Sequence, residues 1–182
     1  YSMNPIDKII DERKKKLDFL RKENYNPYPS KIPAVFSIKE ILESFSRLLK
    51  NRKKVAVAGR IMGIREQGGL IFIDLLCGNG KIQGRIQKKN LSDFDLLEKT
   101  LDIGDFVVLT GRAYKTKRGE KSLDAVSAQI IVKSLRPLPN SWYGLKDVEE
   151  RYRKRYLDLI LNKEVKEIFI KGQKLLRRSE IF

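Results

Sequence analysis

The chain has 182 residues, 41% of them hydrophobic, which is enough for one modest domain with appended segments. Its 39 lysines and arginines outnumber its 23 acidic residues, and the formal net charge of +16 fits either a nucleic-acid partner or a highly charged soluble surface. The sequence has no histidine and one cysteine, Cys77, which excludes a Ser-His-Asp hydrolase, a zinc finger and an internal disulfide. No apolar run approaches the ~20 residues of a membrane span. We therefore expect a cytoplasmic protein with no membrane contact.

Residues 1–52 are predicted to form an N-terminal helical extension. Between Asn4 and Glu23, apolar residues recur at helical spacing; they are Ile6, Ile9, Ile10, Leu17 and Leu20. The opposite face is basic, carrying Lys8, Arg13, Lys14, Lys15, Lys16, Arg21 and Lys22. That face fits either an ordinary solvated surface or an arm along RNA phosphates. A capping box at Ser37–Glu40 opens a second helix, whose apolar stripe from Ile38 to Leu49 is predicted to be core.

Residues 53–135 change to the two-residue period of β-strands. Strands are predicted at 55–64, 70–76, 81–87, 105–114 and 121–132, with a short helical pattern around 94–101. Three strands, a helix and two strands is the element order of the OB-fold, a five-stranded Greek-key barrel, although other small barrels share parts of it. The predicted fold class is an all-β OB-fold barrel with N-terminal helices and a C-terminal helical extension.

Strand alternation predicts which side chains face out of this barrel. Ile71, Ile73 and Leu75 should point inward, which places Phe72 on the outer face. By the same alternation Gln83 and Arg85 point outward from the third strand, and Arg60 points outward from the first. An exposed ring beside an amide and cations suits an unstacked RNA base. The alternative is that Phe72 packs beneath a helix.

The hairpin between the last two strands contains Lys117 and Glu120. A carboxylate in a basic nucleic-acid site needs a donor, which a base N–H supplies, although Glu120 also fits an ordinary polar turn. No acid–base catalytic site emerges, because Asp158 and the Asp11–Glu12 pair read as solvated or salt-bridged helix residues. The Gly78-Asn79-Gly80 turn lacks the spacing of a phosphate-binding loop.

Residues 136–182 are predicted to be a linker followed by helices. Arg136-Pro137-Leu138-Pro139 is a stiff segment, and charged helical patterns cover 147–161 and 164–182. The last helix carries an apolar stripe that includes Ile168, Leu175 and Leu176.

The segment from Tyr143 to Ile160, YGLKDVEERYRKRYLDLI, resembles the junction segment of class II lysyl-tRNA synthetases, GLxDxExRYRxRYLDL. Val57-Ala58-Gly59-Arg60 and the KTKRGE hairpin at 115–120 are similar to other motifs of that family, as is the linker 135–139. Aspartate- and asparagine-specific relatives share the end of the junction string but usually lack its paired RYRxRY spelling.

This resemblance implies an OB domain that binds the anticodon stem-loop of tRNA(Lys). The family holds the central uridine with an aromatic residue on the second strand, a glutamine on the third and a glutamate in the last hairpin. By motif, these residues correspond to Phe72, Gln83 and Glu120. Arg60 resembles a family arginine near the anticodon backbone, and Arg85 and Lys117 complete the expected RNA-binding set.

The tail from Glu167 resembles the beginning of motif 1, the dimerisation helix of the family, while motifs 2 and 3 have no counterpart. We expect residues 136–182 to be the linker and the start of a class II catalytic domain. The full-length enzyme would be a homodimer that uses ATP and Mg²⁺ to attach lysine to tRNA. This chain alone would bind tRNA without a cofactor and without acylating it. The alternatives are an aspartyl or asparaginyl relative, a free-standing OB RNA-binding module, and an OB protein for other polyanions or a protein partner.

Overall fold

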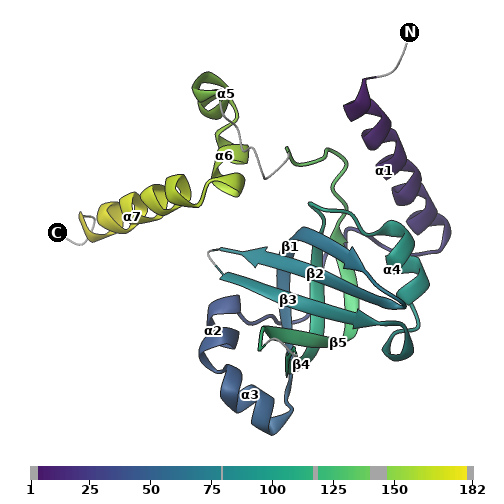
Figure 1. Cartoon of the computed structure of the whole chain (residues 1–182). Coiled ribbons are helices and arrows are strands. Elements are labelled where there is room, and N and C mark those ends of the chain that lie inside the picture. Colours follow the sequence, from purple (N-terminus) through teal and green to yellow (C-terminus); the bar gives the residue numbers. More distant parts are fainter. Residues whose placement is uncertain (1–3, 79, 117–118, 140–146, 180–182) are drawn as a thin grey trace. The chain divides into compact units, whose positions relative to one another are not determined.

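A computed structural model describes residues 4–78, 80–116, 119–139 and 147–179 (Figure 1). The chain divides into two compact units, Tyr1–Pro137 and Leu138–Phe182. In the described residues, no helix is both long enough and apolar enough to cross a membrane.

The first unit is built around a closed barrel in the strand order β1-β2-β3-β5-β4. The strands are β1 (Lys54–Glu66), β2 (Leu70–Cys77), β3 (Gly80–Gln87), β4 (Phe106–Lys115) and β5 (Lys121–Val132). All pairs are antiparallel except β3 with β5, which is parallel. A 3-10 turn at Lys88–Asn90 and helix α4 (Phe94–Thr100) connect β3 to β4. The OB-fold prediction is confirmed.

Inward-facing branched side chains fill the barrel. Ile71, Ile73 and Leu75 alternate along β2 and are each at most 1% exposed, so the predicted alternation is confirmed there. Gly84 on β3 is required by close packing, because a Cβ at this residue would lie 2.2 Å from Cδ1 of Leu109. A branched neighbour on β4 therefore occupies the space that a side chain on β3 would take.

Three helices precede the barrel. They are α1 (Pro5–Lys22), α2 (Ile38–Glu43) and α3 (Phe45–Asn51). The capping box of Ser37 and Glu40 is present, but the helix that it opens was predicted to be continuous and is instead divided at Ser44. The predicted stripe still packs as one surface, since Ile38, Ile41, Phe45 and Leu48 are all buried. In Figure 1, α2 and α3 lie on the opposite side of the barrel from α1 and α4.

The predicted faces of α1 need one correction. Arg13 was assigned to the basic outer face, but it is 7% exposed and its guanidinium donates to the backbone carbonyls of Ser134 (3.0 Å) and Ile103 (2.9 Å). Arg13 shares the inward stripe of Leu17 and Leu20, at spacings of four and seven residues. A third backbone carbonyl, that of Arg136, accepts from the same guanidinium at 3.3 Å, while the buried Nε has no hydrogen-bond partner among the described residues.

A buried ion cluster lies at the same end of the barrel. The ammonium group of Lys133, whose side chain is fully buried, donates to the Thr100 carbonyl (2.6 Å), to Asp105 (2.7 Å) and to Asp102. Lys16 of α1 also reaches Asp102, at 2.7 Å. The cluster ties α1, the end of α4 and the segment after β5 together.

The second unit contains α5 (Val148–Arg153), α6 (Arg155–Leu161) and α7 (Lys163–Ser179). The single helix predicted for 147–161 is divided at Lys154. Asp158 is 1% exposed and accepts from Arg151 Nε at 2.9 Å, from Asn162 Nδ2 at 3.3 Å and from Arg155. Two of the three arginines of the RYRKRY string, Arg151 and Arg155, thus neutralise a buried carboxylate within the same unit.

Candidate nucleic-acid interface

A hollow of about 1010 Å³ lies on the outer face of the barrel, where β1, β2 and β3 meet the hairpin between β4 and β5. Its walls carry both charged and aromatic side chains. The lining residues are Arg65, Glu66, Gln67, Gly68, Leu70, Phe72, Gln83, Arg85, Tyr114, Thr116 and Glu120. Four of the six residues expected to bind RNA, namely Phe72, Gln83, Arg85 and Glu120, therefore line one hollow.

Phe72 is half-buried and stands between two arginines. It pairs with Arg65 on β1 and with Arg85 on β3, and directly opposed residues of antiparallel strands share a face. The ring therefore forms part of the wall, with an arginine on each neighbouring strand. A base placed on this ring would gain a stacking surface and cationic neighbours.

Gln83 faces the hollow but is only 5% exposed, because neighbouring side chains surround it. Its Oε1 accepts a hydrogen bond from the buried hydroxyl of Ser122 at 3.1 Å, and Ser122 is its pairing partner on β5. The amide oxygen is therefore already hydrogen-bonded within the protein. The amide N–H₂ group is left to donate into the hollow.

Glu120 is exposed at the β4–β5 hairpin, whose shape depends on Thr116. The Thr116 hydroxyl accepts from the Glu120 N–H at 3.0 Å, and the Glu120 carbonyl accepts from the Thr116 N–H at 3.0 Å. Gly119 has φ +82°, a left-handed conformation that favours glycine. Lys117, the fifth expected residue, lies outside the described residues.

Arg85 is held on two sides. Its Nε donates to Asp124 Oδ1 at 3.0 Å, and its guanidinium carbon lies 3.9 Å from the centre of the Tyr114 ring. Gln87 Nε2 donates to the same oxygen of Asp124 at 2.7 Å. The carboxylate thus organises two side chains of β3 from the neighbouring strand β5.

Arg60, the sixth expected residue, does not line the hollow. Its guanidinium lies over the Phe106 ring at 4.2 Å and donates to the Gly104 carbonyl at 3.2 Å. Burial lowers the pKa of this guanidinium from its ordinary value. Arg60 pairs with Leu76, four residues along β2 from Phe72, which separates it from the other candidates.

Sequence reasoning missed Arg65 and Tyr114. Alternation counted onward from Ile61 would turn Arg65 inward, but the register of β1 shifts between Ile61 and Gly63. One extra residue turns the rest of the strand over, so Arg65 opposes Phe72 on the outer face. The same alternation could have placed Tyr114 on the outer face. Val107, Leu109 and Ala113 of β4 are the inward, buried residues, and Tyr114 follows the last of them.

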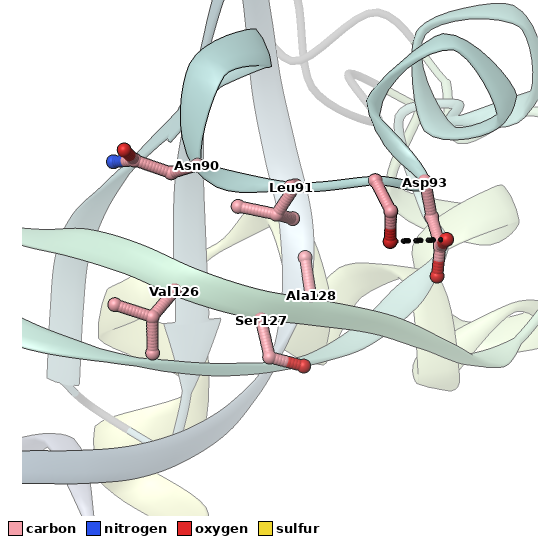
Figure 2. A pocket seen from close by; sticks show the side chains of 7 residues that line it. Asn90, Leu91, Asp93, Val126, Ser127 and Ala128 are labelled. Atoms are coloured by element: carbon pink, nitrogen blue, oxygen red, sulfur yellow. Dashed lines mark hydrogen bonds between the residues drawn. The ribbon is translucent and has the colours of Figure 1, made fainter.

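A second hollow is much smaller, at about 110 Å³, and lies between β5 and the segment after β3 (Figure 2). Polar and small side chains line it, among them Asn90, Ser127 and Ala128, and the Ser92 hydroxyl donates to Asp93 at 2.9 Å. Its volume falls below the range of roughly 300–1,000 Å³ typical of ligand sites. Elsewhere in the described part of the chain, no cluster of three or more Cys, Asp or Glu side chains could hold a metal ion.

The fold and the hollow define a class of protein. Residues 55–138 match the family described as "OB-fold nucleic acid binding domain", which agrees with the closed five-stranded barrel of the structure.

The chain as a whole is similar to lysine–tRNA ligases. It is 42% identical over 97% of its length to the lysine–tRNA ligase of Carboxydothermus hydrogenoformans, and 43% identical over 94% to lysine–tRNA ligase 2 of Methanosarcina mazei. The corresponding values for the lysine–tRNA ligase of Clostridium tetani are 40% and 97%. The predicted resemblance to lysyl-tRNA synthetases is confirmed. The chain spans about a third of the length of these relatives, 36%, 34% and 35% respectively.

Proposed function

We propose that this barrel binds the anticodon stem-loop of tRNA(Lys) and that the hollow holds the central uridine of the anticodon. The observation that carries the proposal is that Phe72, Gln83 and Glu120 line one hollow. They come from β2, β3 and the β4–β5 hairpin, which are elements that OB-folds use for single strands.

The chemistry of the three side chains complements uracil. The ring of Phe72 offers a stacking surface, and the amide of Gln83, with its oxygen bonded by Ser122, offers an N–H donor to a uracil carbonyl. The exposed carboxylate of Glu120 accepts from the uracil N–H. Cytosine lacks that N–H and has an amine in place of the O4 carbonyl, so Glu120 disfavours cytosine, as does a Gln83 donor placed at O4.

We propose that the chain is part of a lysine–tRNA ligase, which is the name that its relatives carry, and that this enzyme is cytoplasmic. ATP and Mg²⁺ belong to motifs 2 and 3, which have no counterpart in these residues, so no step of adenylate formation is assigned to this chain. We propose that the longer protein is a homodimer. The exposure of Ile168 (67%) and Leu175 (67%) on α7 supports an apolar interface there.

Two other functions use the same barrel. Aspartyl and asparaginyl relatives read anticodons with the same central U, but the RYRKRY string and the similarity to lysine–tRNA ligases favour lysine. A free-standing RNA-binding module would leave the junction string without a function in binding.

The test compares stem-loops with UUU and UCU anticodons at one fixed salt concentration, because phosphate contacts depend steeply on salt. We expect wild type to prefer UUU, with each good edge contact contributing roughly 1–3 kcal/mol, as in DNA base readout. Gln83→Ala and Glu120→Ala should reduce this preference more than they reduce total affinity. Glu98→Ala, which removes an exposed carboxylate from α4, is the matched control and should keep the preference.

Two results would contradict the proposal at different levels. If wild type binds UUU and UCU equally, the barrel is a general RNA binder. If wild type prefers UUU and neither variant changes the preference, the roles of Gln83 and Glu120 are wrong.

A further inference from the structure

We propose that Asp124 is a positioning residue that fixes the Arg85 guanidinium for RNA binding. This inference rests on the proposed function of the hollow. Asp124 does not line the hollow itself; it lies on β5 opposite Arg85 in the parallel β3–β5 pairing. The side chains of Arg85 and Asp124 are 20% and 28% exposed, so this ion pair is partly shielded from water.

Two contacts restrict the orientation of the planar Arg85 guanidinium, one at its edge and one at its face. The Nε–Asp124 hydrogen bond of 3.0 Å fixes one edge of the planar group, and the Tyr114 ring, 3.9 Å away, covers one face. A free arginine loses much rotational freedom when it binds a ligand. Here that freedom is restricted before any ligand arrives, which removes part of the cost of binding.

The remaining donors of Arg85 are available to a ligand. Among the described residues, no acceptor is hydrogen-bonded to Nη1 or Nη2. Arg85 lines the hollow beside Phe72, its pairing partner on β2. The guanidinium is therefore placed to donate to an oxygen of the nucleotide that stacks on Phe72, either a phosphate oxygen or a base carbonyl.

A similar contact is found two residues away on the same two strands. Ser122 on β5 bonds the side chain of its partner Gln83, as Asp124 bonds the side chain of Arg85. Strand β5 thus supports, from outside the hollow, two side chains that face into it. Asp124 also accepts from Gln87 at 2.7 Å, so its carboxylate has two donors on β3.

This role makes a prediction opposite in sign to simple electrostatics. A carboxylate near an RNA site repels phosphates, so its removal by charge alone would strengthen binding. If Asp124 instead positions Arg85, D124A should bind the UUU stem-loop about 2- to 10-fold more weakly, which corresponds to the ordering of one long side chain. D124N should bind as tightly as wild type or more tightly, because the Asn oxygen still accepts from Arg85 and Gln87.

Three further measurements separate positioning from a general structural effect. In an R85A background, D124A should cause no additional weakening. In the free protein, the Arg85 Nε–H resonance should be protected from solvent exchange in wild type and D124N, and lose that protection in D124A. R85K keeps the charge without the Nε anchor, and should bind as weakly as D124A.

The UUU and UCU stem-loops identify the oxygen that Arg85 contacts. A reduced preference for UUU assigns the O4 carbonyl, which cytosine lacks, whereas equal weakening of both by D124A assigns an oxygen that the two stem-loops share, a phosphate oxygen or O2. The proposal is overturned if D124A binds as tightly as wild type, or if it weakens binding equally in the R85A background. If wild type binds neither stem-loop, the proposed function fails and this inference with it; if wild type binds and D124A is unaffected, only this inference fails.

Discussion

The two units of this chain are stabilised in different ways. The barrel unit buries a continuous apolar core that includes Phe45, Ile73, Phe94 and Leu109, each at most 1% exposed. Between 147 and 177, where side chains are described in the second unit, the only buried residue is the carboxylate of Asp158. The first unit therefore has a hydrophobic core, whereas the described part of the second is organised around charge pairs.

This difference bears on cooperativity. Apolar burial contributes roughly 25 cal/mol per Å², and a shared core makes distant elements unfold together. Exposed ion pairs contribute little, with a median of about 0–1 kcal/mol, so helices held by them open locally. We expect the barrel unit to unfold as one cooperative unit and α5–α7 to open at lower free energy.

The largest effect should come from the buried cluster of the barrel unit. Lys133→Met leaves the fully buried Asp105 without its ammonium partner and the Thr100 carbonyl without its donor. Breaking a buried pair in this way costs about 3–5 kcal/mol. Urea unfolding followed by circular dichroism should show a large fall in the midpoint, while hydrogen exchange of α5 and α6 stays unchanged.

Lys88→Met is the matched control for that experiment. Lys88 also lies 2.7 Å from a carboxylate, that of Asp95, but both side chains are about 60% exposed, at 61% and 59%. Its removal should leave the urea midpoint unchanged. A wild-type midpoint for Lys133→Met would mean that the cluster does not stabilise the barrel, and the contrast between the units would lose its main support.

A smaller and local effect is expected in the second unit. Asp158→Ala removes the shared acceptor of Arg151 and Arg155, whose side chains are 29% and 30% exposed. Since water can partly replace the lost partner, the cost should be about 1–3 kcal/mol. Hydrogen exchange should accelerate across 148–161 without a change in barrel unfolding.

Glu149→Ala provides the corresponding control, because it removes an exposed i,i+4 pair with Arg153 on α5, worth roughly 0.3–0.5 kcal/mol. If Asp158→Ala lowers the barrel midpoint as well, the two units unfold together, and the division into separate stability units is wrong.

The strands of the barrel were largely predictable because inward and outward side chains alternate along them. The ends of all five predicted strands agree with the structure within two residues, since the inward residues are branched and the turns are marked. Alternation is a local property, and it failed where the register changed: the shift between Ile61 and Gly63 hid Arg65 from prediction.

Partners distant in sequence were not predictable in the same way. Nothing near Arg13 indicates that its acceptors are the carbonyls of Ile103, Ser134 and Arg136. Likewise, Gln83 could be placed on the outer face, but its low exposure and its bond to Ser122 depend on the parallel pairing of β3 with β5. The candidate site was therefore predictable as a set of outward side chains and not as a hydrogen-bonded arrangement.

The smallest expected effect concerns the side-chain caps at the start of two helices, one in each unit. The side chain of Ser37 accepts from the N–H of Glu40 at 3.2 Å at the start of α2, and Asp147 accepts from the N–H of Glu149 at 2.9 Å at the start of α5. Replacing either cap by alanine should cost about 1 kcal/mol in its own helix.

What should differ is where that cost is measured. Helix α2 buries Ile38 and Ile41 against the barrel unit, so Ser37→Ala should lower the Tm of the barrel unit by roughly 2–8 °C. Helix α5 has no buried residue, so Asp147→Ala should leave that Tm unchanged and raise hydrogen exchange only at the start of α5. Equal shifts of the barrel Tm by both variants would show that α5 shares the barrel's cooperative unit. No shift by Ser37→Ala would show that α2 frays before the barrel unfolds, and that burial of its two isoleucines does not couple it to the core.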